Sequence, residues 1–201
     1  FSDIENALDG FIPEWRDPSN SNWQDQVFRT GSYKEASASA SGGTDKTTFY
    51  VGGSYFDQEG ILINNAFERI SGRLNLDHKA SDRVTVGANF SLARSENNRV
   101  SNDNAFSTPL QIVALAPIQP IIDPETGELN ENTTYYNGLI EARDAFNNMI
   151  VYRNISKVYG DLKIIPGLNF RSEFGLDLLN QDEEGYQGSQ TQDGAPGGSG
   201  E

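Results

Sequence analysis

Residues 69–77 have the sequence Arg-Ile-Ser-Gly-Arg-Leu-Asn-Leu-Asp, in which apolar and polar side chains alternate. In an extended strand, Ile70, Leu74 and Leu76 share one face, and the charged and amide side chains share the other. In a soluble sandwich the apolar face points into the core. In an outer-membrane barrel it points to lipid, and the polar face lines a wet lumen. The choice between these two arrangements decides the class of protein.

The same alternation occurs on both sides of this segment and predicts an all-β chain of about six antiparallel strands. The sequence around it includes NWQDQVFRTG at 22–31 and SGGTDKTTFYVGGSYFDQEG at 41–60. The predicted strands span about 32–41, 46–57, 67–78, 83–95, 150–164 and 168–179.

The connections between the predicted strands alternate in length. Turns rich in Gly, Pro, Asp and Ser at 41–46, 79–83 and 165–168 are short. Long connections fall at 57–66, at 98–149 and beyond 180. Transmembrane barrels have this arrangement, with short periplasmic turns and long extracellular loops.

Strand length favours the barrel over the sandwich. Most of the predicted strands have 12–13 residues, which exceeds the usual 5–6 residues, and a tilted membrane crossing needs about 9–11. Because the interior of a barrel is filled by side chains at about eight strands, six strands cannot close around a wet lumen. We therefore expect the chain to be an arc of a larger barrel.

The net charge of −14 lies outside the predicted strands. Residues 1–30, 98–149 and 181–201 hold 18 acidic and 4 basic side chains, and the rest of the chain holds 11 of each. Such acidic segments repel phosphate, so a nucleic-acid partner is not expected. The sequence has no run of the roughly 18–20 apolar residues that a membrane-spanning helix needs.

The remaining segments are predicted to be mostly irregular. A capping-box pattern at 2–5 predicts a short helix through residue 8. The long connection contains two further helix candidates, near 107–116 and at 138–148. Residues 181–201 are rich in Gly, Gln and Asp, and they predict no regular structure.

Several motifs together resemble those of SusC/RagA-type TonB-dependent outer-membrane transporters of Bacteroidota. They are the Trp-Gln-Asp segment within 22–31, a Ser-Gly-Gly turn, Tyr-Phe-Asp-Gln-Glu-Gly at 55–60, the strand at 69–77 and Gly-Leu-Asn-Phe-Arg-Ser-Glu-Phe-Gly-Leu-Asp at 167–177. The order and spacing of these motifs match the family over nearly all of 20–180.

The resemblance implies a segment of a large, plugged, lipid-embedded β-barrel in the cell outer membrane. It implies import of oligosaccharides or peptides, with a SusD-like surface lipoprotein as lid and the TonB complex as energy source. We expect 1–201 to be a partial barrel that lacks the plug, the TonB box and the C-terminal strands, and that is not functional alone. Residues 98–149 are expected to form a long extracellular loop.

Candidates for catalysis or metal binding are few. The chain has no cysteine and a single histidine, His78, beside a turn, which supplies neither a zinc site nor a nucleophilic triad. Carboxylate groups such as 182–184 or the pair Glu125 and Glu128 lie in segments where desolvation is not expected. The acidic residues also lack the spacing of an EF-hand. We expect no enzyme activity, no catalytic residue, no metal site and no cofactor.

Aromatic residues outside the strands are the ligand-contact candidates, because they can stack on a sugar or dock a lid. Tyr135, Tyr136 and Trp15 are the chosen candidates. Packing between loops or an interfacial aromatic belt is the alternative role for such residues. Charged residues of the strands are expected to face the lumen and to pair with one another or with a plug: Arg69, Arg73, Arg171, Glu173 and Asp177.

Two other classes of protein stay open at this point. A soluble β-sandwich that binds carbohydrate is the main alternative, and a secreted β-rich hydrolase is the third. The transported substrate is not identified by the sequence.

Overall fold

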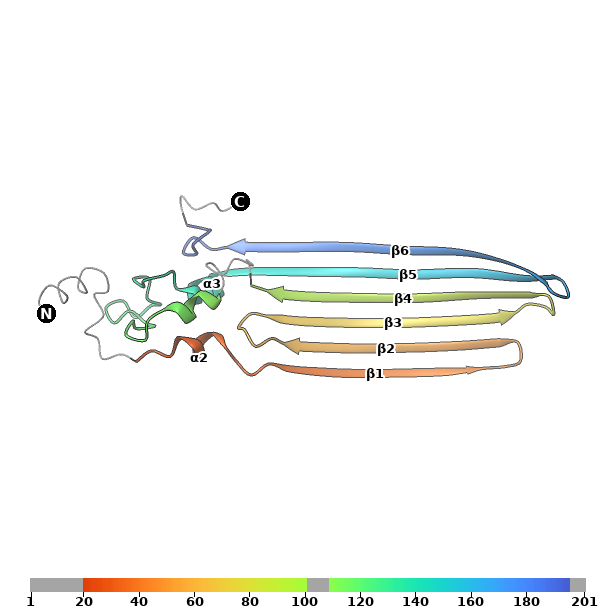
Figure 1. Cartoon of the computed structure of the whole chain (residues 1–201), viewed down its shortest axis with the longest axis horizontal. Coiled ribbons are helices and arrows are strands. Elements are labelled where there is room, and N and C mark those ends of the chain that lie inside the picture. Colours follow the sequence, from red (N-terminus) through yellow and green to blue (C-terminus); the bar gives the residue numbers. More distant parts are fainter. Residues whose placement is uncertain (1–19, 101–108, 196–201) are drawn as a thin grey trace, which may run out of the picture.

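The computed structural model describes residues 20–100 and 109–195, which form one six-stranded antiparallel sheet in the order β1-β2-β3-β4-β5-β6 (Figure 1). Each strand pairs with the next one along the chain, so the sheet is a continuous series of hairpins. The strands are β1 (Ser32–Gly43), β2 (Thr47–Glu59), β3 (Ala66–Lys79), β4 (Val84–Arg99), β5 (Ala145–Ile165) and β6 (Leu168–Gln187). The predicted all-β fold class is confirmed.

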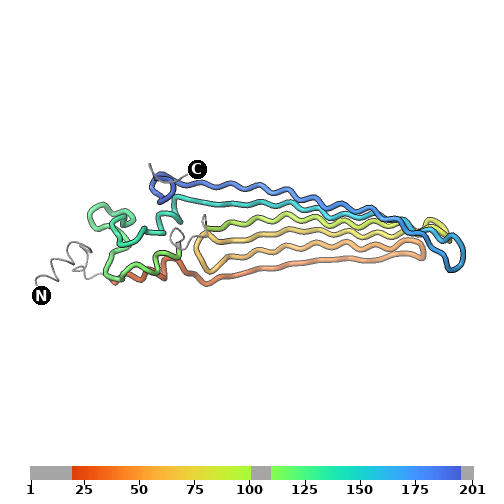
Figure 2. The backbone as a smooth tube through the Cα atoms, turned by 45° about the horizontal axis from the view of Figure 1, so that its top comes forward, coloured from red at the N-terminus to blue at the C-terminus, as the bar shows by residue number. Residues whose placement is uncertain are grey.

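The turns at the two ends of the sheet differ, as Figures 1 and 2 show. The β1–β2, β3–β4 and β5–β6 turns lie together at one end and are short. Gly167 makes the last of them possible because its φ of 89° is unfavourable for residues with a Cβ. The β2–β3 and β4–β5 connections lie at the opposite end, which we call the loop end.

The strand register sorts side chains onto two faces, because directly opposed residues in neighbouring strands point the same way. Asp77 on β3 is opposite Gly87 on β4, which is opposite Tyr159 on β5, which is opposite Glu173 on β6. We call this side the polar face. Leu76 and its opposed residues Ala88, Val158 and Phe174 follow the other side, the apolar face.

Several strands extend farther toward the loop end than the sequence predicted. β5 begins at Ala145, and β6 continues to Gln187, so the prediction of irregular structure for 181–187 was wrong. The helix predicted at 138–148 ends at Asp144 for the same reason. In these extensions polar residues also occur on the apolar face, such as Asn148, Asp182 and Glu184, so the alternation that identifies a strand is lost although the hydrogen bonding continues.

Short helices form a cap at the loop end: α2 (Trp23–Val27), the 3₁₀ helix η2 (Pro109–Ala114) and α3 (Gly138–Asp144) (Figure 1). The sequence prediction missed α2, where the side chain of Asn22 caps the helix by accepting from the backbone N–H of Asp25. Part of the segment 107–116 is helical, as predicted, but as a 3₁₀ helix. The helix predicted at 2–8 lies outside the described residues.

The cap has its own small hydrophobic core. Trp23, Val27, Ile112 and Leu115 are buried against one another, and Leu62 from the β2–β3 loop packs on them. The indole Nε1 of Trp23 also donates to the carbonyl oxygen of Ala116 at 3.2 Å. Segments far apart in sequence are therefore joined at the loop end.

The sheet has no such core among the described residues. All of the buried hydrophobic side chains there belong to the cap, and the apolar face stays exposed or half-exposed. Phe174, in the middle of β6, is 67% exposed. None of the helices in the described ranges is long and apolar enough to cross a membrane.

A substitution in the cap core tests whether the cap is a packed unit. We expect Ile112→Ala to destabilise the cap by about 2–4 kcal/mol, because Ile112 is fully buried and its removal leaves a cavity. The neighbouring Val113 is 44% exposed, so Val113→Ala is the matched control and should cost less than about 0.5 kcal/mol. Hydrogen exchange of 109–115 measures both, and equal protection in the two variants would contradict the packing described.

Candidate functional site

The apolar face carries a band of mainly apolar side chains across the sheet, small on β1 and mostly large on β2–β6. On β6 the band runs from Leu168 to Leu178, and on β4 from Val84 to Leu92. Ten residue steps span about 33 Å along a strand, or about 25 Å along the membrane normal at the usual barrel tilt. The band thus has the height of the lipid-facing girdle of an outer-membrane barrel.

Polar and aromatic groups mark the upper edge of this band, toward the loop end. The Tyr55 hydroxyl donates to Glu68 at 3.1 Å, and Arg94 Nε donates to the Tyr152 hydroxyl at 3.3 Å. Arg94 also pairs with Glu96 at 2.7 Å. In outer-membrane barrels, aromatic girdles of this kind lie at the membrane interface.

A charged network crosses β5 and β6 on the polar face. Arg171 donates to Asp161 at 2.8 Å and to Glu173, and its guanidinium lies 4.0 Å from the ring centroid of Tyr159. The Tyr159 hydroxyl in turn donates to Asp77 on β3. The network ties three strands together by side-chain contacts.

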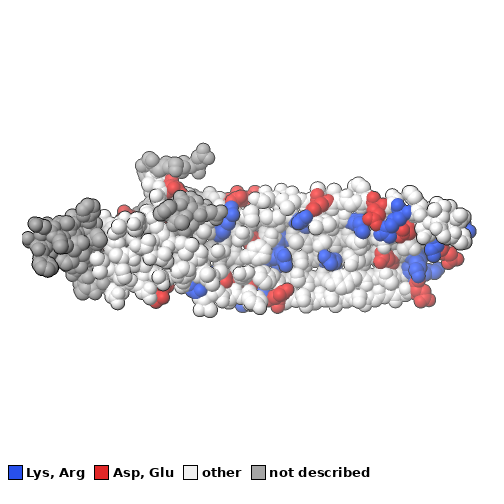
Figure 3. All heavy atoms as spheres, in the orientation of Figure 1, with Lys and Arg blue, Asp and Glu red and all other residues white. Residues whose placement is uncertain are grey.

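The expected lumen-facing residues share the polar face, but only some are paired. Asp177 accepts from Arg153 at 2.8 Å, a partner that the sequence did not suggest. Arg69 and Arg73 form no hydrogen bond or ion pair with any residue in the described ranges. Figure 3 shows this contrast: red and blue side chains lie side by side over β5 and β6, whereas blue side chains stand alone over the middle strands. That these residues face a lumen stays a prediction.

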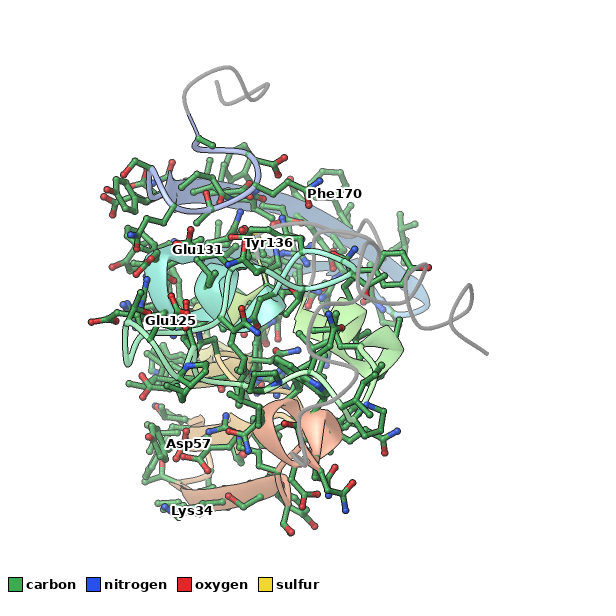
Figure 4. All side chains as sticks on the ribbon, turned by 90° about the vertical axis from the view of Figure 1, so that its left-hand side faces the viewer. Lys34, Asp57, Glu125, Glu131, Tyr136 and Phe170 are labelled. Atoms are coloured by element: carbon green, nitrogen blue, oxygen red, sulfur yellow. The ribbon has the colours of Figure 1, made fainter. Side chains whose placement is uncertain are left out.

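The ligand-contact candidates do not share one environment. Tyr135 is exposed, whereas Tyr136 is half-buried in the cap, and its hydroxyl donates to the carbonyl oxygen of Gln190 at 3.0 Å (Figure 4). Burial, reinforced by the Glu141 carboxylate, raises the pKa of Tyr136. Trp15 lies outside the described residues. Of the two described candidates, Tyr135 is the one whose side chain is exposed.

A cavity of about 860 Å³ lies between α3 and the loop-side ends of β4–β6. Its walls mix apolar and polar side chains, and two ion pairs lie there: Arg99 with Glu183 at 3.0 Å, and Arg143 with Asp144 at 2.7 Å. Hydrogen bonds from Arg143 lower the pKa of Asp144 below its ordinary value. The first pair joins β4 to β6, and the second lies between neighbouring residues at the end of α3.

The remaining candidates for catalysis or metal binding do not gather into a site. The ring Nδ1 of His78 lies 2.7 Å from the hydroxyl oxygen of Thr47 on the neighbouring strand. Within 20–100 and 109–195, no cluster of three or more metal-ligating side chains is found.

Comparison with known proteins agrees with this geometry. No family model matches the sequence. The chain is 28% identical over 173 residues to TonB-dependent receptor P3 of Formosa agariphila, which covers 81% of this chain. It is 29% identical to TonB-dependent receptor P26 of the same organism over 90% of this chain, and 27% identical to TonB-dependent receptor SusC of Bacteroides thetaiotaomicron over 53%. The chain is similar to TonB-dependent receptors, SusC among them. The resemblance noted in the sequence is confirmed.

Solved structures give the same fold. The chain superposes on the RagAB peptide importer in its closed-closed state with a TM-score of 0.66 and 20% identity, over 92% of this chain and 23% of that one. It spans 17% of the P3 receptor and 18% of the P26 receptor, less than a fifth of either. The six-stranded sheet therefore matches one arc of a receptor barrel.

Some residues of the polar network were missed because their partners are distant in sequence. Tyr159 and Asp77 are 82 positions apart, and only the pairing of β3, β4 and β5 brings them together. Finding these partners would have required a prediction of strand register in addition to the positions of the strands.

The paired and unpaired arginines should differ in their effect on stability. We expect Arg171→Gln to lower the free energy of unfolding by up to about 1 kcal/mol, because Asp161 and Glu173 lose their shared partner at a solvent-exposed site. The matched control Arg73→Gln should change it by less than about 0.3 kcal/mol, since no described residue pairs with Arg73. Urea unfolding of the full-length parent in detergent compares the two, and a larger effect at Arg73 would contradict the assignment.

Proposed function

We propose that this chain forms part of the wall of an outer-membrane TonB-dependent importer of oligosaccharides or peptides. In this proposal the short turns lie on the periplasmic side, and the cap at the loop end lies outside the cell. The apolar face contacts lipid, and the polar face, with Arg69, Arg73, Arg171, Glu173 and Asp177, lines the lumen. The segment contributes a wall to the importer and is not functional alone.

The observation that carries this proposal is the pairing of an exposed apolar band with a charged opposite face. Among the described residues a single sheet is present, and no second protein layer covers Phe170, Phe174 or Leu178. A β-sandwich would bury these side chains between two sheets. In a barrel wall, lipid contacts the apolar face, and water in the lumen solvates the ion pairs on the opposite face.

The unpaired edges of the sheet support the interpretation that it is an arc of a larger barrel. In the described residues β1 and β6 each pair on one side only, which leaves a row of backbone N–H and C=O groups on the other side. Such groups cannot stay unpaired in a hydrocarbon environment, so further strands must flank both edges. The small share of the homologues that this chain covers agrees with that requirement.

The cap supplies the surface for extracellular partners. Exposed apolar side chains on it include Ile61, Val113, Ile122 and Tyr135. We assign this surface, within residues 57–66 and 98–149, to contact with a SusD-like lipoprotein lid, while Tyr135, Tyr136 and Trp15 are the candidates for ligand contact. Coupling to the TonB complex would use regions outside this chain. No catalytic role is assigned.

Charge substitutions on the two faces test the membrane orientation directly. We expect Ala88→Arg to destabilise the inserted barrel by about 2–4 kcal/mol, because Ala88 lies in the middle of the apolar band. Asn89→Arg is the matched control, since the adjacent Asn89 lies on the polar face between Asn75 and Lys157 and should be tolerated. The measurement is the amount of full-length parent recovered in the outer membrane, together with its unfolding in lipid bilayers. Equal tolerance of both substitutions would refute the lipid-facing assignment.

A further inference from the structure

Three aromatic rings interrupt the polar face of β1–β3 near the loop end. Tyr33 and Phe56 are stacked, with ring centroids 6.1 Å apart and planes 22° apart. Phe56 and Phe67 have centroids 6.1 Å apart in a tilted arrangement. We call Tyr33, Phe56 and Phe67 the aromatic trio.

On β1–β3 the aromatic trio has no further apolar neighbour on its own face. The next rows of that face, farther from the loop end, carry Ser37, Ser54 and Ser71. Tyr33 is 72% exposed, and the rings of Phe56 and Phe67 are half-buried by each other and by their strand neighbours. An aromatic patch on an otherwise polar wall gains stability when a further apolar surface stacks on it.

Four planar polar side chains surround the aromatic trio and are unpaired. Glu35 and Arg69 are directly opposite Phe56 on its two neighbouring strands. Gln58 stands between Tyr33 and Phe67, and Asn97 is opposite Phe67 on β4. None of the four side chains forms a hydrogen bond or ion pair with the residues described here. On β5 and β6, by contrast, the charges of the same face are paired with one another.

This combination matches the surface of a sugar ring. A pyranose presents an apolar face of C–H groups, which can stack on aromatic rings, and a rim of hydroxyl groups. Carboxylate, amide and guanidinium groups are planar and can contact two adjacent hydroxyls at once. An extended peptide would bind here less well. The backbone groups of β2 and β3 are already used in strand pairing, so they leave no main-chain hydrogen-bond partners for it.

We propose that the aromatic trio, with Glu35, Gln58, Arg69 and Asn97, is a saccharide-binding subsite on the wall below the cap. The subsite rests on the proposed function, because it faces the transport path only if the polar face lines the lumen. It holds one sugar unit by stacking on Tyr33 and Phe56, and the polar side chains contact its hydroxyls. The subsite is distinct from Tyr135 and Tyr136, which lie in the cap.

The test uses the purified full-length parent in detergent, probed with an array of neutral and acidic oligosaccharides beside an array of peptides. We expect the wild type to bind at least one oligosaccharide and Tyr33→Ala to weaken that binding about 10-fold. Tyr33→Phe keeps the ring and should stay within about 2-fold of the wild type, whereas Arg69→Gln should weaken binding without changing the amount of folded protein. The matched control is Tyr186→Ala, which removes an exposed tyrosine stacked on Phe146 at 5.9 Å on the opposite face.

The outcomes separate this subsite from the importer itself. Oligosaccharide binding that is unchanged in Tyr33→Ala, or weakened equally in Tyr186→Ala, overturns the subsite. Binding of peptides alone by the wild type also overturns it, while leaving the importer proposal intact. Absence of the full-length parent from the outer membrane, measured separately by membrane fractionation, overturns the importer proposal instead.

Discussion

The constraint on which the structure depends is that, among the described residues, no protein core covers the apolar face of the sheet. Backbone hydrogen bonds join six long strands, yet side chains such as Phe170 and Phe174 remain exposed. In water such a sheet would aggregate through its apolar face and its two unpaired edges. Lipid against that face, and flanking strands at both edges, remove both problems together. The proposed barrel wall would supply both.

The distribution of charge follows from the same constraint. Charged side chains in the middle of the strands are confined to the polar face, where Arg171 and Arg153 find carboxylate partners across the strands. On the apolar face, charges begin only above the band, around Arg94 and its partners. The excess acidic charge of the sequence lies in residues 1–30, 98–149 and 181–201, outside the predicted strands. At the loop end, the cap is held by a small core of its own around Trp23 and Ile112.

The sequence was sufficient to predict the number of strands, their order along the chain and the end at which the long connections lie, because alternation and turn residues act locally. It was insufficient for features that local sequence patterns do not determine. The upper part of β6 was missed because polar residues occupy both faces there, and α2 because a five-residue helix leaves little periodicity. The pairing of Tyr159 with Asp77 depends on strand register. For the aromatic trio, Tyr33 and Phe67 come together only through β2.

The orientation of the two faces is tested most directly by a solvent-accessibility scan along β6. The chain contains no cysteine, so single cysteines at each position from 168 to 178 of the full-length parent can carry a spin label in lipid bilayers. The orientation proposed here predicts a period of two, with even positions accessible to oxygen dissolved in lipid and odd positions accessible to a water-soluble nickel complex. A scan without alternation, or with the two sets of positions exchanged, would contradict it.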